Sequence, residues 1–155
     1  MVRINSATAT LQLPDVIWKT CPWQPRSLIE TGLRQWLRCA GVALGDGQVI
    51  GMPSHAVDEA WHGFILCTGR YARFCDDAYG QFLHHHPEGG APDAVAGSSA
   101  SMVDQLGRTV VAWSVVAETG ESCVLWDLDS RVGAEQLWGI PADRVAAVVA
   151  RLASP

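Results

Sequence analysis

Apolar residues recur at intervals of three and four in five separate parts of the chain. That spacing places side chains along one face of a helix, so each part predicts an amphipathic helix. The predicted helices cover residues 27–41, 54–67, 71–79, 102–118 and 142–152. Within 102–118 the run 109–113 is rich in β-branched residues and would also suit a strand, but we favour a helix. The pattern therefore predicts an all-α protein, a small bundle of about five helices.

Four of the predicted helix ends carry residues with a specific stereochemical role. Ser27 and Glu30 have the spacing of a capping box, in which each side chain satisfies a free backbone N–H of the first turn. Gly41 is placed to end this first helix. Ser54 is expected to cap the second helix, and Gly80 to end the third in a left-handed conformation.

The length of 155 residues favours one domain with one core. Residues 1–26 are expected to form an N-terminal arm, because three prolines rule out one long helix there while several apolar residues supply anchors. Residues 27–155 then form a single helical domain. Within it, the stretch 87–101 is rich in Gly, Pro, Ala and Ser and predicts a flexible loop.

Charge and composition narrow the classes of partner. The chain is 48% hydrophobic and 17% charged, and its net charge is −5 with scattered basic residues, which argues against binding nucleic acid. We find no apolar run long enough to cross a membrane and no export signal, and the five cysteines contain no CxxC pair. We therefore expect a cytoplasmic protein. Ten of its eleven basic residues are arginine, which suggests a GC-rich bacterial source.

Candidate metal ligands gather in one third of the chain, since all five histidines lie between residues 55 and 86. Asp58 and His62 are four residues apart on a predicted helix and so share a face. Both side chains could bind a metal ion, or Asp58 could orient the ring of a metal-bound His62. A surface contact without function is the third interpretation of the pair.

Two turns would bring further ligands to His62. If the chain reverses at residues 68–70, the segment 54–79 becomes a helical hairpin at the centre of the fold, with Cys75 level with His62. If it turns again at Gly80, His85 reaches the same point. The predicted metal ligands are therefore His62, Cys75, His85 and Asp58. This set suits Zn²⁺ first, with Cu or Fe as alternatives.

Three functional hypotheses remain open at this point. The first is a small metal-binding protein, which as an enzyme would be a tailoring or accessory metalloenzyme that acts on a small-molecule substrate. The second is a metal-free module that binds a partner protein through exposed tryptophans and the N-terminal arm. The third is a thiol hydrolase built on Cys75 and His62, which we rank below the others because Cys75 lacks the glycine-rich turn that usually exposes such a nucleophile.

Three segments resemble a family of small bacterial proteins related to the N-terminal region of plant glycine-rich domain-containing proteins. The family patterns are VDxxWHxxIL, TxxYxxFC and GxxLxH. The matching residues here are Val57, Asp58, Trp61, His62, Ile65, Leu66, Thr68, Tyr71, Phe74, Cys75, Gly80, Leu83 and His85. The resemblance covers residues 27–87, and is weaker over 102–138, where 125–133 is similar to the family's LFALDxxLG segment. It implies that the four candidate ligands act as one unit and selects His85 from the histidine run. It implies no activity, because the members are mostly uncharacterised.

Overall fold

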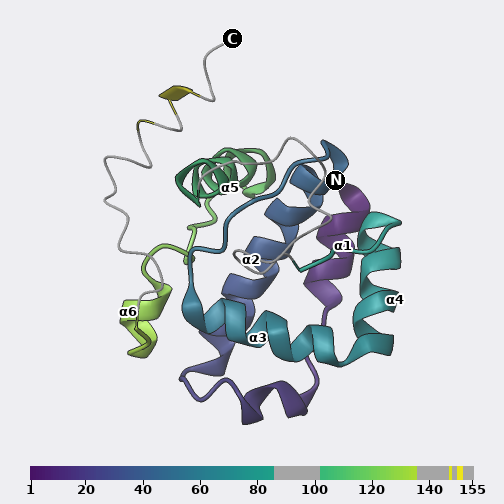
Figure 1. Cartoon of the computed structure of the whole chain (residues 1–155), viewed down its shortest axis with the longest axis vertical. Coiled ribbons are helices and arrows are strands. Elements are labelled where there is room, and N and C mark those ends of the chain that lie inside the picture. Colours follow the sequence, from purple (N-terminus) through teal and green to yellow (C-terminus); the bar gives the residue numbers. More distant parts are fainter. Residues whose placement is uncertain (86–101, 136–146, 148–149, 152–155) are drawn as a thin grey trace.

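The computed structural model describes residues 1–85, 102–135, 147, 150 and 151. This part of the chain contains six α-helices, one 3₁₀ helix and no β-strand, so the all-α prediction is confirmed (Figure 1). The elements are α1 (Val2–Thr10), η1 (Asp15–Lys19), α2 (Arg26–Gly45), α3 (His55–Leu66), α4 (Thr68–Tyr79), α5 (Met102–Val116) and α6 (Leu128–Val132). Among the described residues, no helix combines the length and apolar character that crossing a membrane requires.

Helix α2 is the centre of the bundle and contacts all five other α-helices. The predicted stop at Gly41 is wrong, because α2 continues to Gly45. Gly41 instead permits close packing: a Cβ there would lie 2.7 Å from a ring carbon of Tyr79 and 2.8 Å from Ile4 Cδ1. The helix begins one residue earlier than predicted, after Pro25, and no side chain caps it, so the Ser27 capping box does not form.

The N-terminal residues expected as an arm are helical and packed against the bundle. Helix α1 lies beside α4 and contacts α2, while η1 contacts α3 (Figure 1). The guanidinium of Arg3 donates hydrogen bonds to the backbone oxygens of Asp76 and Asp77, at 2.8 and 3.2 Å. It thereby anchors α1 to the last turn of α4, where the Asp76 carbonyl also accepts a hydrogen bond from the Gly80 N–H.

The predicted break between the second and third helices is present, one residue early, at Cys67. The two helices meet there at a corner and do not run back alongside each other (Figure 1). The helix that packs along α4 is α1. The hairpin geometry that would have set Cys75 level with His62 is therefore absent. The predicted left-handed cap at Gly80 is confirmed, with φ of 70°.

Helix α5 confirms the helical prediction for the residues after 102, including the β-branched run 109–113. It is fixed to the segment before α3 by Gly51, whose backbone oxygen accepts hydrogen bonds from Trp36 Nε1 at 2.9 Å and Thr109 Oγ1 at 2.7 Å. The predicted loop 87–101 lies outside the described residues, as does most of the predicted last helix, 142–152.

Candidate metal site

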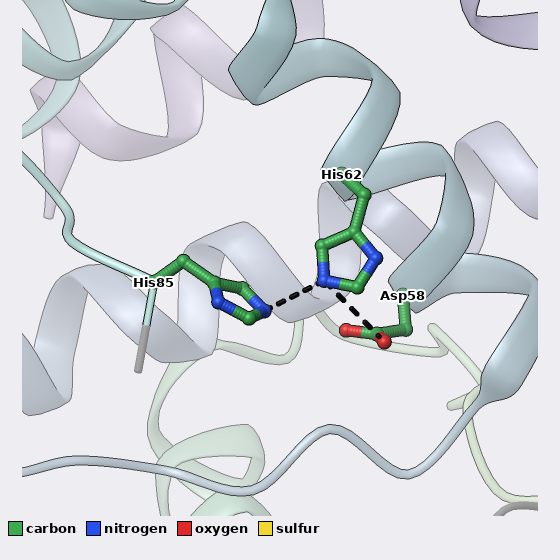
Figure 2. A group of neighbouring side chains, drawn as sticks. All are labelled: Asp58, His62 and His85. Atoms are coloured by element: carbon green, nitrogen blue, oxygen red, sulfur yellow. Dashed lines mark hydrogen bonds and ion pairs between the residues drawn. The ribbon is translucent and has the colours of Figure 1, made fainter. Parts of the chain in front are cut away.

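Three of the four predicted ligands converge at the surface of α3. Asp58 and His62 lie one turn apart on that helix, and His85 approaches from the segment after α4 (Figure 2). The Nε2 atom of His62 is 3.7 Å from Asp58 Oδ2 and 2.6 Å from His85 Nε2. One ligand atom from each residue lies within 4.8 Å of the other two. The same nitrogen of His62 thus faces both a carboxylate and a second imidazole.

Helix α3 is held at its N-terminus by a residue that sequence reasoning missed. Ser54 caps the helix as predicted, since its hydroxyl accepts a hydrogen bond from the Val57 N–H. The buried carboxylate of Asp129 in α6 accepts hydrogen bonds from Ser54 Oγ at 2.7 Å and from the backbone N–H groups of His55 and Ala56 at 2.7 and 3.1 Å. A negative charge is favourable at this end of a helix. No local signal reveals the contact, because the partners are more than 70 residues apart.

The segment that carries His85 is fixed by two buried aromatic residues. Tyr71 donates a hydrogen bond from its hydroxyl to the backbone oxygen of Leu83 at 2.6 Å, and accepts one from Trp61 Nε1 at 3.2 Å. The ring of Trp61 also packs against that of His85, with 4.9 Å between the centroids. Both aromatic residues are buried in the core. They connect the core to the position of His85.

We expect Tyr71→Phe to make the segment that carries His85 more mobile, without removing a candidate metal ligand. The substitution deletes the hydroxyl between Trp61 Nε1 and Leu83 O, and leaves the buried indole N–H and the partly buried carbonyl without that partner. An unsatisfied buried group costs about 1–3 kcal/mol. Thermal denaturation should show the loss in the metal-free protein. Hydrogen exchange should be faster at residues 81–85, and unchanged exchange there would contradict this assignment.

Burial raises the pKa of the Asp58 carboxyl, while the neighbouring His62 opposes that rise and Glu59 adds to it. The two imidazole nitrogens at 2.6 Å cannot both present a lone pair, nor both present a hydrogen. One ring therefore donates its hydrogen to the other, and a metal ion would take the place of that hydrogen only after the two nitrogens move apart.

The distances fit a metal ion after a small adjustment. Zn²⁺ binds imidazole nitrogen at 2.0–2.1 Å, so two ligands in tetrahedral geometry lie about 3.3 Å apart. The separations here, 2.6 and 3.7 Å, lie on either side of that value. Two histidines and one carboxylate are a donor set found in catalytic zinc sites and in mononuclear iron(II) sites, and in both cases positions stay open for other ligands.

Cys75 lies outside this group. Its side chain is buried on α4, where it interacts with the Tyr71 hydroxyl and the backbone at Leu83. Burial raises the pKa of the thiol, although both of those contacts oppose the rise. A protonated, buried thiol is neither an activated nucleophile nor a ready metal ligand. Neither the predicted role in the metal set nor the thiol hydrolase hypothesis is favoured by this position.

The other histidines have separate surroundings. His84 is exposed and packs against Phe82, with 4.8 Å between the ring centroids. His86 lies outside the described residues. His55, at the start of α3, packs against Trp23 and contacts the backbone oxygen of Glu135. Of the histidine run, the structure thus places His85, the residue selected by the resemblance, beside His62.

A polar cavity of about 220 Å³ lies elsewhere, between α1, α2 and the segment after α5. None of the three clustered ligands lines it. Within its wall Arg38 forms an ion pair with Glu121, and Gln35 donates a hydrogen bond to the same carboxylate. These pairs tie the segment after α5 to α2. Arg34 also lines the cavity, and its ion-pair partner Glu30 lies outside the lining.

The fold and the cluster together define a small all-α protein with an Asp/His/His group at one helix surface. A family model described as UCP032817-like matches residues 18–102, which is more than half of the chain, and the chain belongs to this uncharacterised family. No curated protein and no solved structure matches the chain. The matched region contains all three clustered ligands but not Asp129. The resemblance to plant glycine-rich domain-containing proteins stays a prediction.

Proposed function

We propose that this protein binds a single divalent metal ion through Asp58, His62 and His85. The observation that supports this most directly is the convergence of one carboxylate oxygen and a second imidazole nitrogen on His62 Nε2. Zn²⁺ is the first candidate because it accepts imidazole and carboxylate ligands in either tetrahedral or five-coordinate geometry. Iron(II) and copper are the alternatives, iron because two histidines and one carboxylate are a common set for it.

Three protein ligands leave room for water or a small-molecule substrate, so we favour an accessory or tailoring metalloenzyme over a purely structural site. A metal bound here would polarise a substrate oxygen or lower the pKa of a bound water. The chain's own contribution is positional: α3 presents Asp58 and His62 from one face, and the Tyr71 contact holds the segment that carries His85.

The free cysteines and the net charge support our proposals for the compartment and the partners. All five cysteines are free, which suits a reducing compartment, and we place the protein in the cytoplasm. The net charge of −5 gives no attraction to a phosphate backbone, so a small molecule is the favoured partner. Binding to a partner protein without a metal is the alternative.

We expect untagged protein, purified without chelator, to carry close to one equivalent of metal, and Cys75→Ser to keep it. The thiol lies outside the ligand group, so the change removes no donor. His62→Ala should lose the metal, because His62 contacts both other ligands. Elemental analysis and a titration with Zn²⁺ against a competing chelator measure both effects.

Two outcomes would contradict the proposal. Wild-type protein that carries no metal and gains no thermal stability from added Zn²⁺, Fe²⁺ or Cu²⁺ would favour the metal-free interaction module. Loss of metal from Cys75→Ser, with an unchanged circular dichroism spectrum, would show that the thiol is a ligand and that α4 rearranges to supply it.

A further inference from the structure

Glu59 lies between two histidines on the same face of α3. Its Oε1 atom is 3.9 Å from His62 Nδ1 and 4.0 Å from His55 Nε2. The three residues occupy positions i, i+4 and i+7, which form a continuous row along a helix. All three side chains are partly exposed, at 27–37%. The row ends at His62, the residue shared by both contacts of the candidate metal site.

The orientation of His55 is set from outside the helix. Its Nδ1 atom lies 3.1 Å from the backbone oxygen of Glu135. A carbonyl oxygen only accepts hydrogen bonds, so this ring nitrogen carries the hydrogen. The ring also packs against Trp23, with 4.9 Å between the centroids. With Nδ1 occupied in this way, the Nε2 atom of His55 is the one that faces Glu59.

The two nitrogens of His62 face different partners. Nε2 faces Asp58 and His85, while Nδ1 faces Glu59. The nitrogens lie on different sides of the ring, so Glu59 cannot share an ion bound at Nε2. An imidazole that binds a metal through one nitrogen carries a hydrogen on the other, and a carboxylate beside that hydrogen fixes the tautomer and the ring orientation.

We infer that Glu59 is a positioning residue for the proposed metal site. Its carboxylate stabilises His62 in the tautomer that carries hydrogen on Nδ1, which leaves the Nε2 lone pair for the metal. The separation of 3.9 Å is longer than a hydrogen bond, so the inference requires the Glu59 carboxylate to move closer to Nδ1. The inference rests on the proposed function, because it assigns Glu59 a role toward that same ion.

Glu59→Gln keeps the shape of the side chain and removes its charge. We expect it to weaken Zn²⁺ binding roughly 10–100-fold, the range typical for the loss of a carboxylate behind a metal-bound histidine. Glu118→Gln is the matched control, because Glu118 is 68% exposed and belongs to the segment after α5. It should bind Zn²⁺ as wild type does. Both variants should retain one Zn²⁺ per chain when saturated.

A second readout separates positioning from general stability. In ¹⁵N-labelled protein, the ring nitrogen shifts of His62 report which nitrogen carries the hydrogen. We expect Nδ1–H in the wild type and in Glu118→Gln, and a mixture of tautomers in metal-free Glu59→Gln. The thermal midpoint of metal-free Glu59→Gln should match that of Glu118→Gln, because a merely structural role would move the midpoint and leave the tautomer unchanged.

Three results would overturn the inference. They are wild-type affinity in Glu59→Gln, an equal loss in Glu118→Gln, and a His62 tautomer that does not respond to the substitution. Complete loss of stoichiometric binding in Glu59→Gln would also overturn it, because Glu59 would then be a ligand. Failure of the proposed function is distinguishable from all of these: wild-type protein would bind no Zn²⁺, while the tautomer measurement would still test the contact between Glu59 and His62.

Discussion

His85→Ala should weaken Zn²⁺ binding by more than 100-fold, while His84→Ala should leave it close to that of the wild type. The His85 ring would supply one of the three proposed ligand atoms, and it lies 2.6 Å from His62 Nε2. Loss of a group that only supports a ligand costs about 10–100-fold, so loss of the ligand itself should cost more. Competition titrations and elemental analysis of the saturated variants measure the difference.

His84→Ala is a matched control because the residue is a neighbour of the same type and its ring packs on Phe82 at the surface. His86→Ala, which lies outside the described residues, completes the series. Similar affinities in all three variants would remove His85 from the ligand set. Selective loss in His84→Ala or His86→Ala would keep a site on α3 and show that a different histidine completes it.

Asp129→Ala should lower the free energy of unfolding of the metal-free protein by about 3 kcal/mol. The substitution removes the acceptor for the Ser54 hydroxyl and for two backbone N–H groups at the start of α3. Buried donors left without a partner cost about 1–3 kcal/mol each, and the helix N-terminus also loses a favourable charge. Urea denaturation followed by circular dichroism gives the value directly.

Asp127→Ala is the control for this measurement. Asp127 precedes α6, the helix that contains Asp129. Its side chain is 62% exposed and forms an ion pair with Arg131 at 3.8 Å. An exposed pair of this kind contributes about 0–1 kcal/mol, so its loss should have little effect. If the two variants are equally stable, the bonds from Asp129 do not hold α3. If Asp129→Ala unfolds completely, the milder Asp129→Asn should show an intermediate loss.

Helical periodicity predicts the segments that become α2, α3, α4 and α5, but it misses α1 and α6. It also fails where packing between helices overrides a local signal. Gly41 has the appearance of a helix stop, yet α2 passes through it. The glycine is there because Tyr79 and Ile4 leave no space for a Cβ. Only the arrangement of α1 and α4 around α2 shows this, and that arrangement is not encoded in the residues next to Gly41.

Local spacing along the chain predicts one part of the candidate site, and packing between distant helices determines the other part. The pairing of Asp58 with His62 follows from their spacing on one helix, and Gly80 predicts the turn that precedes His85. Cys75 was grouped with them because spacing reveals a break between two helices but not the direction in which the second one leaves. That direction is set by α1, which lies along α4.

The order of residues along the chain means that an ion at the proposed site would cross-link the chain. His62 and His85 are 23 residues apart, and the whole of α4 lies between them. An ion bound to both would close this stretch into a ring. A permanent cross-link of that size raises the free energy of the unfolded chain by about 3 kcal/mol at room temperature, because it removes conformational entropy. Arg3 donates hydrogen bonds to Asp76 and Asp77, so the stretch that the ion would close also contains the contact that anchors the N-terminal helix.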